Sequence, residues 1–173
     1  MKKTLLVAAM AAVCAVFFTA CPTPEEKTTA DYLMSPKKGW ILQAATSSPA
    51  YELLDGSFAT DLINDGYLYE YELDDIMTFT QADGFNYQII NPGNNIDPEG
   101  EGYQQEVRYL WAFDAVDEGW IYMQVPFFYD DVQEYCQILK INDEEFRFKC
   151  TVNDDDVEAK GTYSFTLTYV PAK

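Results

Sequence analysis

The segment at residues 162–169 reads Thr-Tyr-Ser-Phe-Thr-Leu-Thr-Tyr and alternates strictly between polar and apolar side chains. In an extended strand, successive side chains point to opposite faces of the sheet. The aromatic and aliphatic residues of this segment would therefore share one face, and the hydroxyl-bearing residues would share the other. This pattern predicts a strand with one face on a core and one face in water, as is typical of antiparallel sheets.

The same two-residue alternation recurs from Trp40 onward, in short runs separated by polar turns. The clearest turn is Asp83-Gly84, where glycine supplies the positive φ that a tight hairpin requires. Between residues 47 and 71 the pattern is looser, and we expect a helical turn near residues 59–63. Strands are expected at residues 40–46, 76–80, 85–90, 107–113, 120–125, 137–141, 146–152 and 162–169.

These strands predict an all-β fold, because they follow one another with hairpin connections and no long helical pattern between them. An antiparallel chain of this length must cover its edge strands, and closure into a barrel removes them. We therefore expect an antiparallel, eight-stranded up-and-down barrel over residues 37–173. A β-sandwich is the alternative.

The composition excludes several classes of function. The formal net charge is −18, which repels nucleic acid and anionic lipid, so we expect neither as a partner. The chain contains no histidine, which excludes a Ser-His-Asp or Cys-His arrangement and a His-ligated metal. Carboxylate pairs are too numerous among 29 acidic residues to indicate a catalytic acid and base. We therefore expect that the protein is not an enzyme.

The N-terminal stretch has the layout of a secretory signal peptide. Lys2 and Lys3 precede an apolar run of 15 residues at 4–18, which is shorter than the roughly 20 residues of a transmembrane helix. Cys21 follows the small residue Ala20, and this arrangement resembles the lipobox of bacterial lipoproteins. The resemblance implies a signal peptide at residues 1–20, fatty acids such as palmitate on Cys21, and a lipid anchor in the outer membrane of a bacterial cell envelope.

Residues 21–36 follow the expected anchor and are rich in proline and threonine at their start, so we expect a flexible tether there. Glu25 and Glu26 resemble the acidic surface-export signal of lipoproteins in the Bacteroidota, although a merely soluble tether has the same composition. Both a periplasmic and a surface-exposed location stay open. The membrane partner would be reached through the lipid alone.

Four sets of residues in the barrel segment carry a resemblance to a known family. They are Lys38–Leu42 with Trp40, the residues Pro49-Ala50, Asp55-Gly56 and Thr60–Leu62, the segment Asp74–Phe79 with Asp83–Phe85, and Cys136–Phe146. In these stretches the chain resembles the lipocalin-like lipoproteins of the Bacteroidota. The resemblance implies an eight-stranded barrel with a cavity at one end, and such a barrel is just wide enough to be filled by side chains or to hold one small ligand.

An aromatic stripe is the candidate binding site. Its members are Tyr109, Trp111, Phe113, Trp120 and Tyr122, on two consecutive expected strands. They could line a pocket for a small apolar ligand, or they could simply stack in the core of a scaffold. In the alternative function, a glycan-binding surface module, they would form an exposed platform. The exposure of Trp111 and Trp120 distinguishes these functions, since a row of exposed rings indicates a platform.

Three acidic loops accompany the alternative, because calcium takes several carboxylate oxygens. They lie at Asp97–Glu101, Asp130-Asp131 and Asn153–Asp156, and none has the spacing of an EF-hand. Solvated loop charge explains the same residues. We therefore expect no metal or other cofactor, with calcium as the open alternative.

Cys136 and Cys150 flank a hairpin, and its register decides whether they meet. Opposing thiols would place Lys140 opposite Phe146. A register that places Leu139 opposite Phe148 matches apolar residues better, and it sends the two thiols to opposite faces of the sheet. Although export favours disulfides, we expect two unpaired cysteines.

Overall fold

The computed structural model describes residues 26–53, 55–95, 105–126, 133–154 and 161–173. Strands make up 55% of the structure and helices 7%, so the predicted all-β class is confirmed. The short helices are α2 (Thr29–Leu33) and α3 (Glu70–Leu73). Within the described residues, no helix has the length and apolar character needed to span a bilayer.

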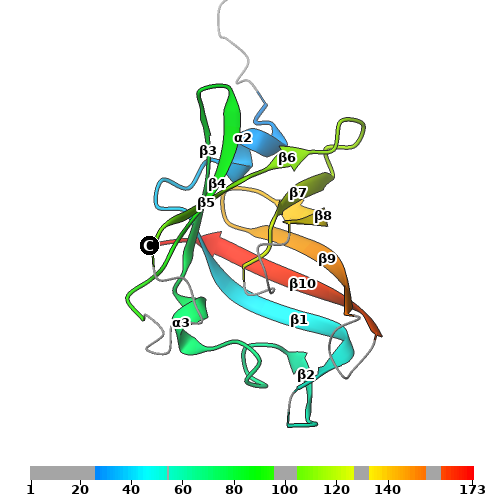
Figure 1. Cartoon of the computed structure of the whole chain (residues 1–173). Coiled ribbons are helices and arrows are strands. Elements are labelled where there is room, and N and C mark those ends of the chain that lie inside the picture. Colours follow the sequence, from blue (N-terminus) through cyan, green and yellow to red (C-terminus); the bar gives the residue numbers. More distant parts are fainter. Residues whose placement is uncertain (1–25, 54, 96–104, 127–132, 155–160) are drawn as a thin grey trace, which may run out of the picture.

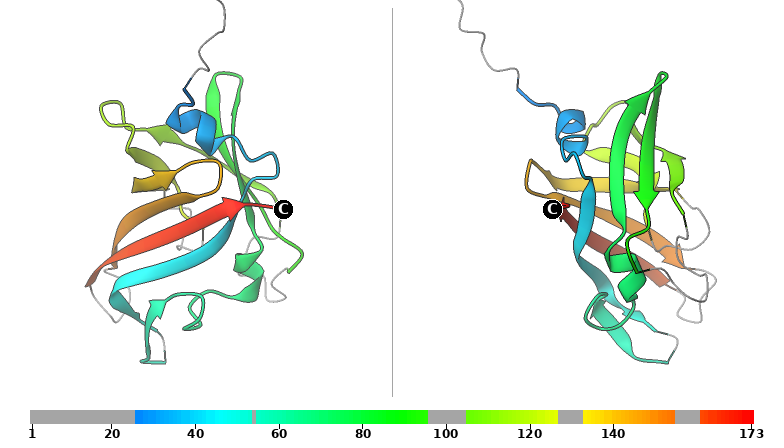
Figure 2. Two further views of the ribbon diagram at one scale, coloured as in Figure 1. Left: turned by 180° about the vertical axis from the view of Figure 1, so that it is seen from behind. Right: turned by 90° about the vertical axis from the view of Figure 1, so that its left-hand side faces the viewer.

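The strands form one antiparallel sheet that curls into a nearly closed barrel (Figures 1 and 2). Their order is β5-β4-β3-β1-β10-β9-β8-β7-β6, and β2 pairs with β1 beside this path. The predicted antiparallel barrel is therefore confirmed, and the sandwich alternative is not what forms. The strands are β1 (Trp40–Glu52), β2 (Phe58–Asp61), β3 (Ile76–Ala82), β4 (Phe85–Asn91), β5 (Val107–Leu110), β6 (Ala112–Phe113), β7 (Trp120–Gln124), β8 (Gln133–Ile141), β9 (Phe146–Asp154) and β10 (Gly161–Pro171).

The barrel path has nine strands rather than eight, because Trp111 divides the expected strand at 107–113. Before Trp111, β5 pairs with β4, and after it β6 pairs with β7. The strands β5 and β6 lie at the two ends of the sheet path. We call the line where these two ends meet the seam. The chain passes from one side of the seam to the other at Trp111, the single residue between β5 and β6.

Gln88 bridges the same seam from β4. Its Nε2 donates to the backbone oxygen of Gln124 at 2.7 Å, and its Oε1 accepts from the backbone nitrogen of Gln124 at 2.8 Å. The Gln88 side chain is fully buried. One amide thus supplies to β7 the donor and the acceptor that a neighbouring strand would otherwise supply.

The core lies inside the barrel and is built from the inward faces of the strands. The alternation predicted for β10 is confirmed, since its four aromatic and aliphatic residues are buried. Rings from other strands meet them: Phe148 stacks on Tyr169 with centroids 5.9 Å apart, and Trp40 lies 5.8 Å from Phe146. Large side chains thus fill the described interior. Those that are fully buried include Trp40, Met77, Ile90, Ile121, Met123, Phe146, Phe148, Phe165 and Leu167.

The N-terminal helix α2 packs on the barrel, at the end that also carries the β3–β4 turn (Figure 2). Thr28 and Asp31 form a capping box at its start. Leu33 is fully buried, and its carbonyl oxygen accepts a hydrogen bond of 2.8 Å from Trp40 Nε1. Residues 29–33 are therefore part of the folded unit and not of a flexible tether, because an apolar side chain and an indole N–H fix them.

The expected helical turn at residues 59–63 is wrong. Residues 58–61 form β2, in which Ala59 lies opposite Tyr51 of β1. The helical turn was expected because Ala59 and Leu62 are three residues apart, like neighbours on one helix face. Both side chains are instead buried against the sheet. Tertiary packing thus overrides the local pattern.

Candidate functional site: the outer aromatic strip and the barrel interior

The predicted aromatic stripe is divided between the two faces of the barrel wall. Trp111 is only 3% exposed, and its ring packs on Phe79 and Phe113 with centroids 5.7 Å and 5.2 Å apart. Tyr109 lies opposite the buried Gln88, so it belongs to the same inner face. These three predicted residues, Tyr109, Trp111 and Phe113, are therefore part of the interior.

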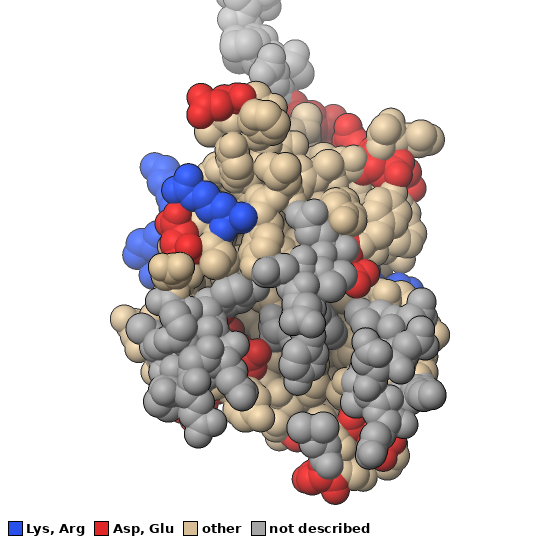
Figure 3. Space-filling model, viewed as in Figure 1, with Lys and Arg blue, Asp and Glu red and all other residues tan. Residues whose placement is uncertain are grey.

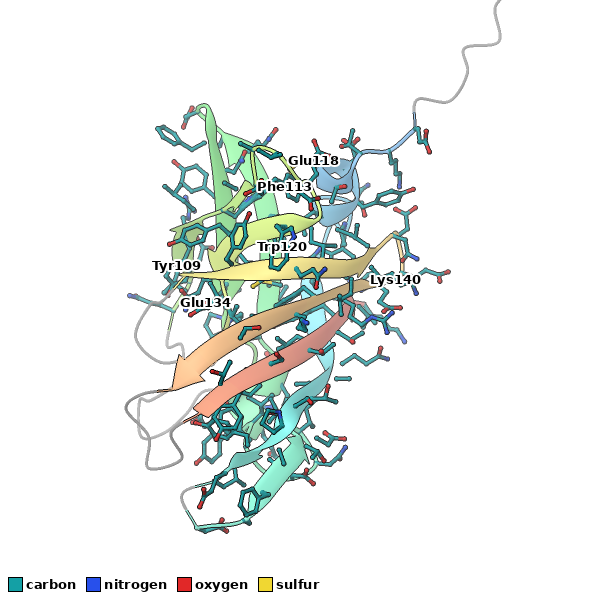
Figure 4. All side chains as sticks on the ribbon, turned by 90° about the vertical axis from the view of Figure 1, so that its right-hand side faces the viewer. Tyr109, Phe113, Glu118, Trp120, Glu134 and Lys140 are labelled. Atoms are coloured by element: carbon teal, nitrogen blue, oxygen red, sulfur yellow. The ribbon has the colours of Figure 1, made fainter. Side chains whose placement is uncertain are left out.

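Trp120 and Tyr122 project from the outer face of β7, because Ile121 and Met123 between and beside them are buried inside. Tyr122 lies opposite Tyr135 of β8, and both tyrosines are 44% exposed. The Trp120 ring stacks on the Tyr135 ring, with centroids 5.1 Å apart and planes 12° apart. We call Trp120, Tyr122 and Tyr135 the outer aromatic strip; Figure 4 shows Trp120 where β7 meets β8.

A carboxylate holds one ring of this strip in place. Asp114 Oδ2 accepts a hydrogen bond from the Tyr135 hydroxyl, and Asp114 Oδ1 accepts from the backbone nitrogens of Val116 and Asp117 at 2.8 and 3.0 Å. The hydrogen bond to Asp114 is the main reason why the pKa of Tyr135 rises to about 12. The phenol therefore stays neutral and oriented at ordinary pH, and the ring needs no ordering when a ligand binds.

Sequence reasoning missed Tyr135. Its position in a polar run, between Glu134 and Cys136, gave no aromatic pattern along the strand. The signal is the pairing of β7 with β8, which places Tyr122 and Tyr135 directly opposite each other on one face.

Two neighbouring carboxyl groups, those of the half-buried Asp74 and the buried Asp75, bind backbone N–H groups. Asp74 Oδ2 accepts from the backbone nitrogens of Asn94 and Asn95, and Asp75 Oδ1 accepts from that of Gly93. Burial raises the pKa of Asp75 to about 7. A side chain at Gly93 would overlap Asp74, with its Cβ 2.1 Å from the carboxyl carbon, so the close approach requires glycine. Asp74 and Asp75 therefore clamp the chain after β4.

The interior also holds polar groups near the seam. Glu134 lies opposite Met123 on the inner face, and burial raises the pKa of its carboxyl group. Trp111 Nε1 and Gln124 Oε1 are buried and make no hydrogen bond. Two open, shallow hollows lie on the outside of the described part of the chain, one beside Glu26–Asp31 and the other along residues 81–86. Neither fits the cavity that the lipocalin resemblance implies.

The exposed charge is mainly acidic. Figure 3 shows acidic side chains at both ends of the visible face, with the basic ones gathered on one side. Several basic groups are already paired: Lys140 and Arg147 with Glu145, and Lys27 with Asp143. An anionic ligand would therefore meet a repulsive surface.

Cys136 and Cys150 carry separate thiols in this structure, and the register that we expected to send them to opposite faces of the sheet is wrong. The register near the turn is the expected one, with Ile141 opposite Phe146. A β-bulge at Leu139 then shifts it by one residue, so that Gln137 lies opposite Lys149. Cys136 and Cys150 consequently share the inner face and are 0% and 1% exposed.

Two further predictions lie outside the described residues. Cys21 belongs to residues 1–25, and the acidic loops at 97–101 and 130–131 and residues 155–156 of the third loop fall in segments that the structure does not describe. In the part of the chain that it does describe, no group of three potential metal ligands comes together. Lipidation and calcium binding both stay predictions.

Searches against protein-family models, curated proteins and solved structures found no match for this chain. The structure itself defines the class, which is an all-β protein with an antiparallel, nearly closed barrel. The resemblance to lipocalin-like lipoproteins remains a prediction made from the sequence.

Proposed function

We propose that this chain is a lipid-anchored protein of a bacterial cell envelope whose lipocalin-like barrel is a filled scaffold, and that it binds a neutral glycan on its outer aromatic strip. The observation that carries the binding proposal is the stack of Trp120 on Tyr135, flanked by the exposed Tyr122. Of the two tryptophans whose exposure distinguishes a platform from a pocket, Trp111 is buried and Trp120 is half-buried between exposed tyrosines, so only the part of the stripe on β7 supports a platform.

The chemistry of sugars fits such a strip. A pyranose ring presents C–H groups on its faces and hydroxyl groups around its edge. The faces pack on aromatic rings, while the edge hydroxyls need hydrogen-bond partners. The tyrosine hydroxyls and the exposed carboxylates of the turn between β6 and β7, such as Glu118, provide partners beside the rings.

The charge of the protein favours a neutral ligand. The formal net charge is −18, and the basic groups Lys27, Lys140 and Arg147 are engaged in ion pairs. Uronic or sulfated sugars would be repelled at long range. We therefore expect uncharged polysaccharides to bind and acidic ones to bind weakly or not at all.

The interior is a weaker candidate for the binding site. Trp111 is buried and packs on Phe79 and Phe113, so these rings occupy the part of the interior where we expected a small apolar ligand. A lipid on Cys21 would also account for membrane attachment without any apolar surface on the barrel. The outer strip is then available for a ligand outside the membrane.

Glycan binding is tested with the full chain on an array of neutral and acidic polysaccharides, followed by calorimetry. Stacking of a nucleic-acid base on one aromatic side chain is worth about 1–3 kcal/mol, and by analogy we expect Trp120→Ala to weaken sugar binding by roughly 10- to 100-fold. Phe58→Ala removes a ring that is 64% exposed on β2, outside the strip, and serves as the matched control. Equal affinities for both variants, or an array with no bound glycan, would refute the proposal.

The anchor is tested separately by metabolic labelling with a tagged fatty acid. The native chain is expected to carry the label and to sediment with membranes. Cys21→Ser is expected to lose the label and the sedimentation together, because two or more acyl chains are needed for stable anchoring. Labelling that persists in Cys21→Ser would contradict the lipid anchor but leave the glycan site untouched.

A further inference from the structure

Two buried thiols face each other across β8 and β9, on the side of the wall opposite the outer aromatic strip. In the ladder between these strands, Ile138 pairs with Phe148 and Gln137 pairs with Lys149. The next pair along the same register is Cys136 with Cys150. Both thiols are buried on the inner face, opposite the buried Ile121 and Phe165, so the register places them face to face.

The strands that flank this pair, β7 and β10, fix the position of both thiols. Cys136 lies opposite Ile121 of β7, and Cys150 lies opposite Phe165 of β10, and both of these partners are buried inside the barrel. Slipping either strand by one residue would turn its whole buried set outward. The strand register therefore determines that the two thiols face each other inside the barrel.

This geometry suits a covalent bond without backbone movement. Opposing residues of an antiparallel pair have Cα atoms about 4.5 or 5.5 Å apart, depending on the hydrogen bonding of the pair. Disulfides span Cα separations of about 4.4–6.8 Å. Both separations lie within the range that a disulfide accepts.

We infer that Cys136 and Cys150 form an intramolecular disulfide that joins β8 to β9 inside the barrel. One thiolate attacks a sulfur of a donor disulfide, carried by an oxidoreductase or a small molecule, and forms a mixed disulfide. The second thiolate displaces the donor. The protein loses two S–H groups and gains one S–S bond, while the donor disulfide is reduced to two thiols.

The timing follows from burial. The hydrogen bond from Cys150 and the loss of solvent both raise the pKa of the Cys136 thiol, so little thiolate is available once the barrel has formed. The bond therefore forms in a partly folded chain, when the β8–β9 hairpin exists but its inner face is still open. After closure, both sulfurs are shielded from reductants.

Only the source of the oxidant rests on the proposed function, because export places the chain in an oxidising compartment. The pairing itself is tested in vitro. The full chain is unfolded, refolded in a mixture of oxidised and reduced glutathione, alkylated, and digested with trypsin without reduction. Lys140, Arg147 and Lys149 lie between the two cysteines, so trypsin separates them unless a disulfide holds the peptides together.

The expected product is a linked pair of peptides that contains Cys136 and Cys150. The matched control combines Cys150→Ser with Thr151→Cys, which moves the thiol by one residue to the exposed outer face. It is expected to give no link to Cys136. Dithiothreitol should reduce the native bond at least about tenfold more slowly than the same bond in denaturant, since the folded barrel must open first.

Alkylated thiols at both positions in correctly refolded protein would overturn the inference, and so would an equally frequent link in the control variant. The same digest of chain taken from the cell envelope separates this inference from the proposed function. If the refolded chain forms the bond but the cellular chain holds free thiols, the pairing stands and export to an oxidising compartment is refuted.

Discussion

Replacing Gln88 with leucine removes both hydrogen bonds that its amide makes across the seam. Each bond contributes about 1 kcal/mol net, and the Gln124 N–H and C=O that are left buried without partners cost about 1–3 kcal/mol each. These contributions overlap, and leucine has a similar volume, so we expect Gln88→Leu to lower the free energy of unfolding by about 3 kcal/mol. This is a large part of the roughly 5–15 kcal/mol that stabilises a domain.

The assay is urea unfolding of the full chain, followed by tryptophan fluorescence, because Trp40 and Trp111 are buried and report on the core. Gln81→Leu is the matched control. Gln81 is exposed, and its amide donates to the side chain of Asn86 on the neighbouring strand at 2.9 Å. We expect the control to change the free energy of unfolding by less than about 0.5 kcal/mol. A loss below about 1 kcal/mol for Gln88→Leu, or equal losses in both variants, would refute the role of the amide in closing the barrel.

Two further outcomes test other parts of the fold. Burial raises the pKa of Asp75 to about 7 from its usual 3.8, so the folded state keeps a proton that the unfolded state loses, and stability contributed by this group falls as the pH rises between these values. Urea midpoints at about pH 5 and pH 8 should therefore fall more steeply for the native chain than for Asp75→Asn; parallel curves would contradict this. Leu33→Ala should cost roughly 2–4 kcal/mol, because Leu33 is fully buried, whereas a flexible tether at this position would show no change.

The alternation in β10 predicted its buried face correctly. Successive side chains of a strand point to opposite faces, so alternating polar and apolar residues show which face is buried. The run from Trp120 to Met123 could not be assigned in the same way. It contains apolar side chains on both faces, so periodicity alone does not tell which pair points inward. The structure resolves this through pairing, since Phe113 lies opposite Ile121 and not opposite Trp120 or Tyr122.

The cysteine register failed for a different reason. Sequence reasoning assumed one constant register along the hairpin, and Leu139 opposite Phe148 looked favourable. The bulge instead leaves Leu139 45% exposed and places Ile138 opposite Phe148. With the bulge, Phe148 faces Ile138 in place of Leu139, and both pairs are apolar. The hairpin sequence alone therefore does not favour one register over the other, and packing against the neighbouring strands decides.

The bridge from Gln88 to Gln124 could not have been predicted either. The two residues are 36 positions apart, and a single glutamine in a strand carries no sign that its amide will act as a strand partner. Such contacts follow from how the sheet curls, which is a property of the whole barrel.

The pairing of β1 with β10 has a consequence for the route by which the chain reaches its folded state. Trp40 lies opposite Pro171, so the central interface of the sheet joins the first strand of the barrel to the last one. During synthesis, β1 must wait for residue 171 before it finds this partner. Contacts of such long sequence separation form slowly. The topology thus keeps the barrel from closing before residues 161–171 have been made.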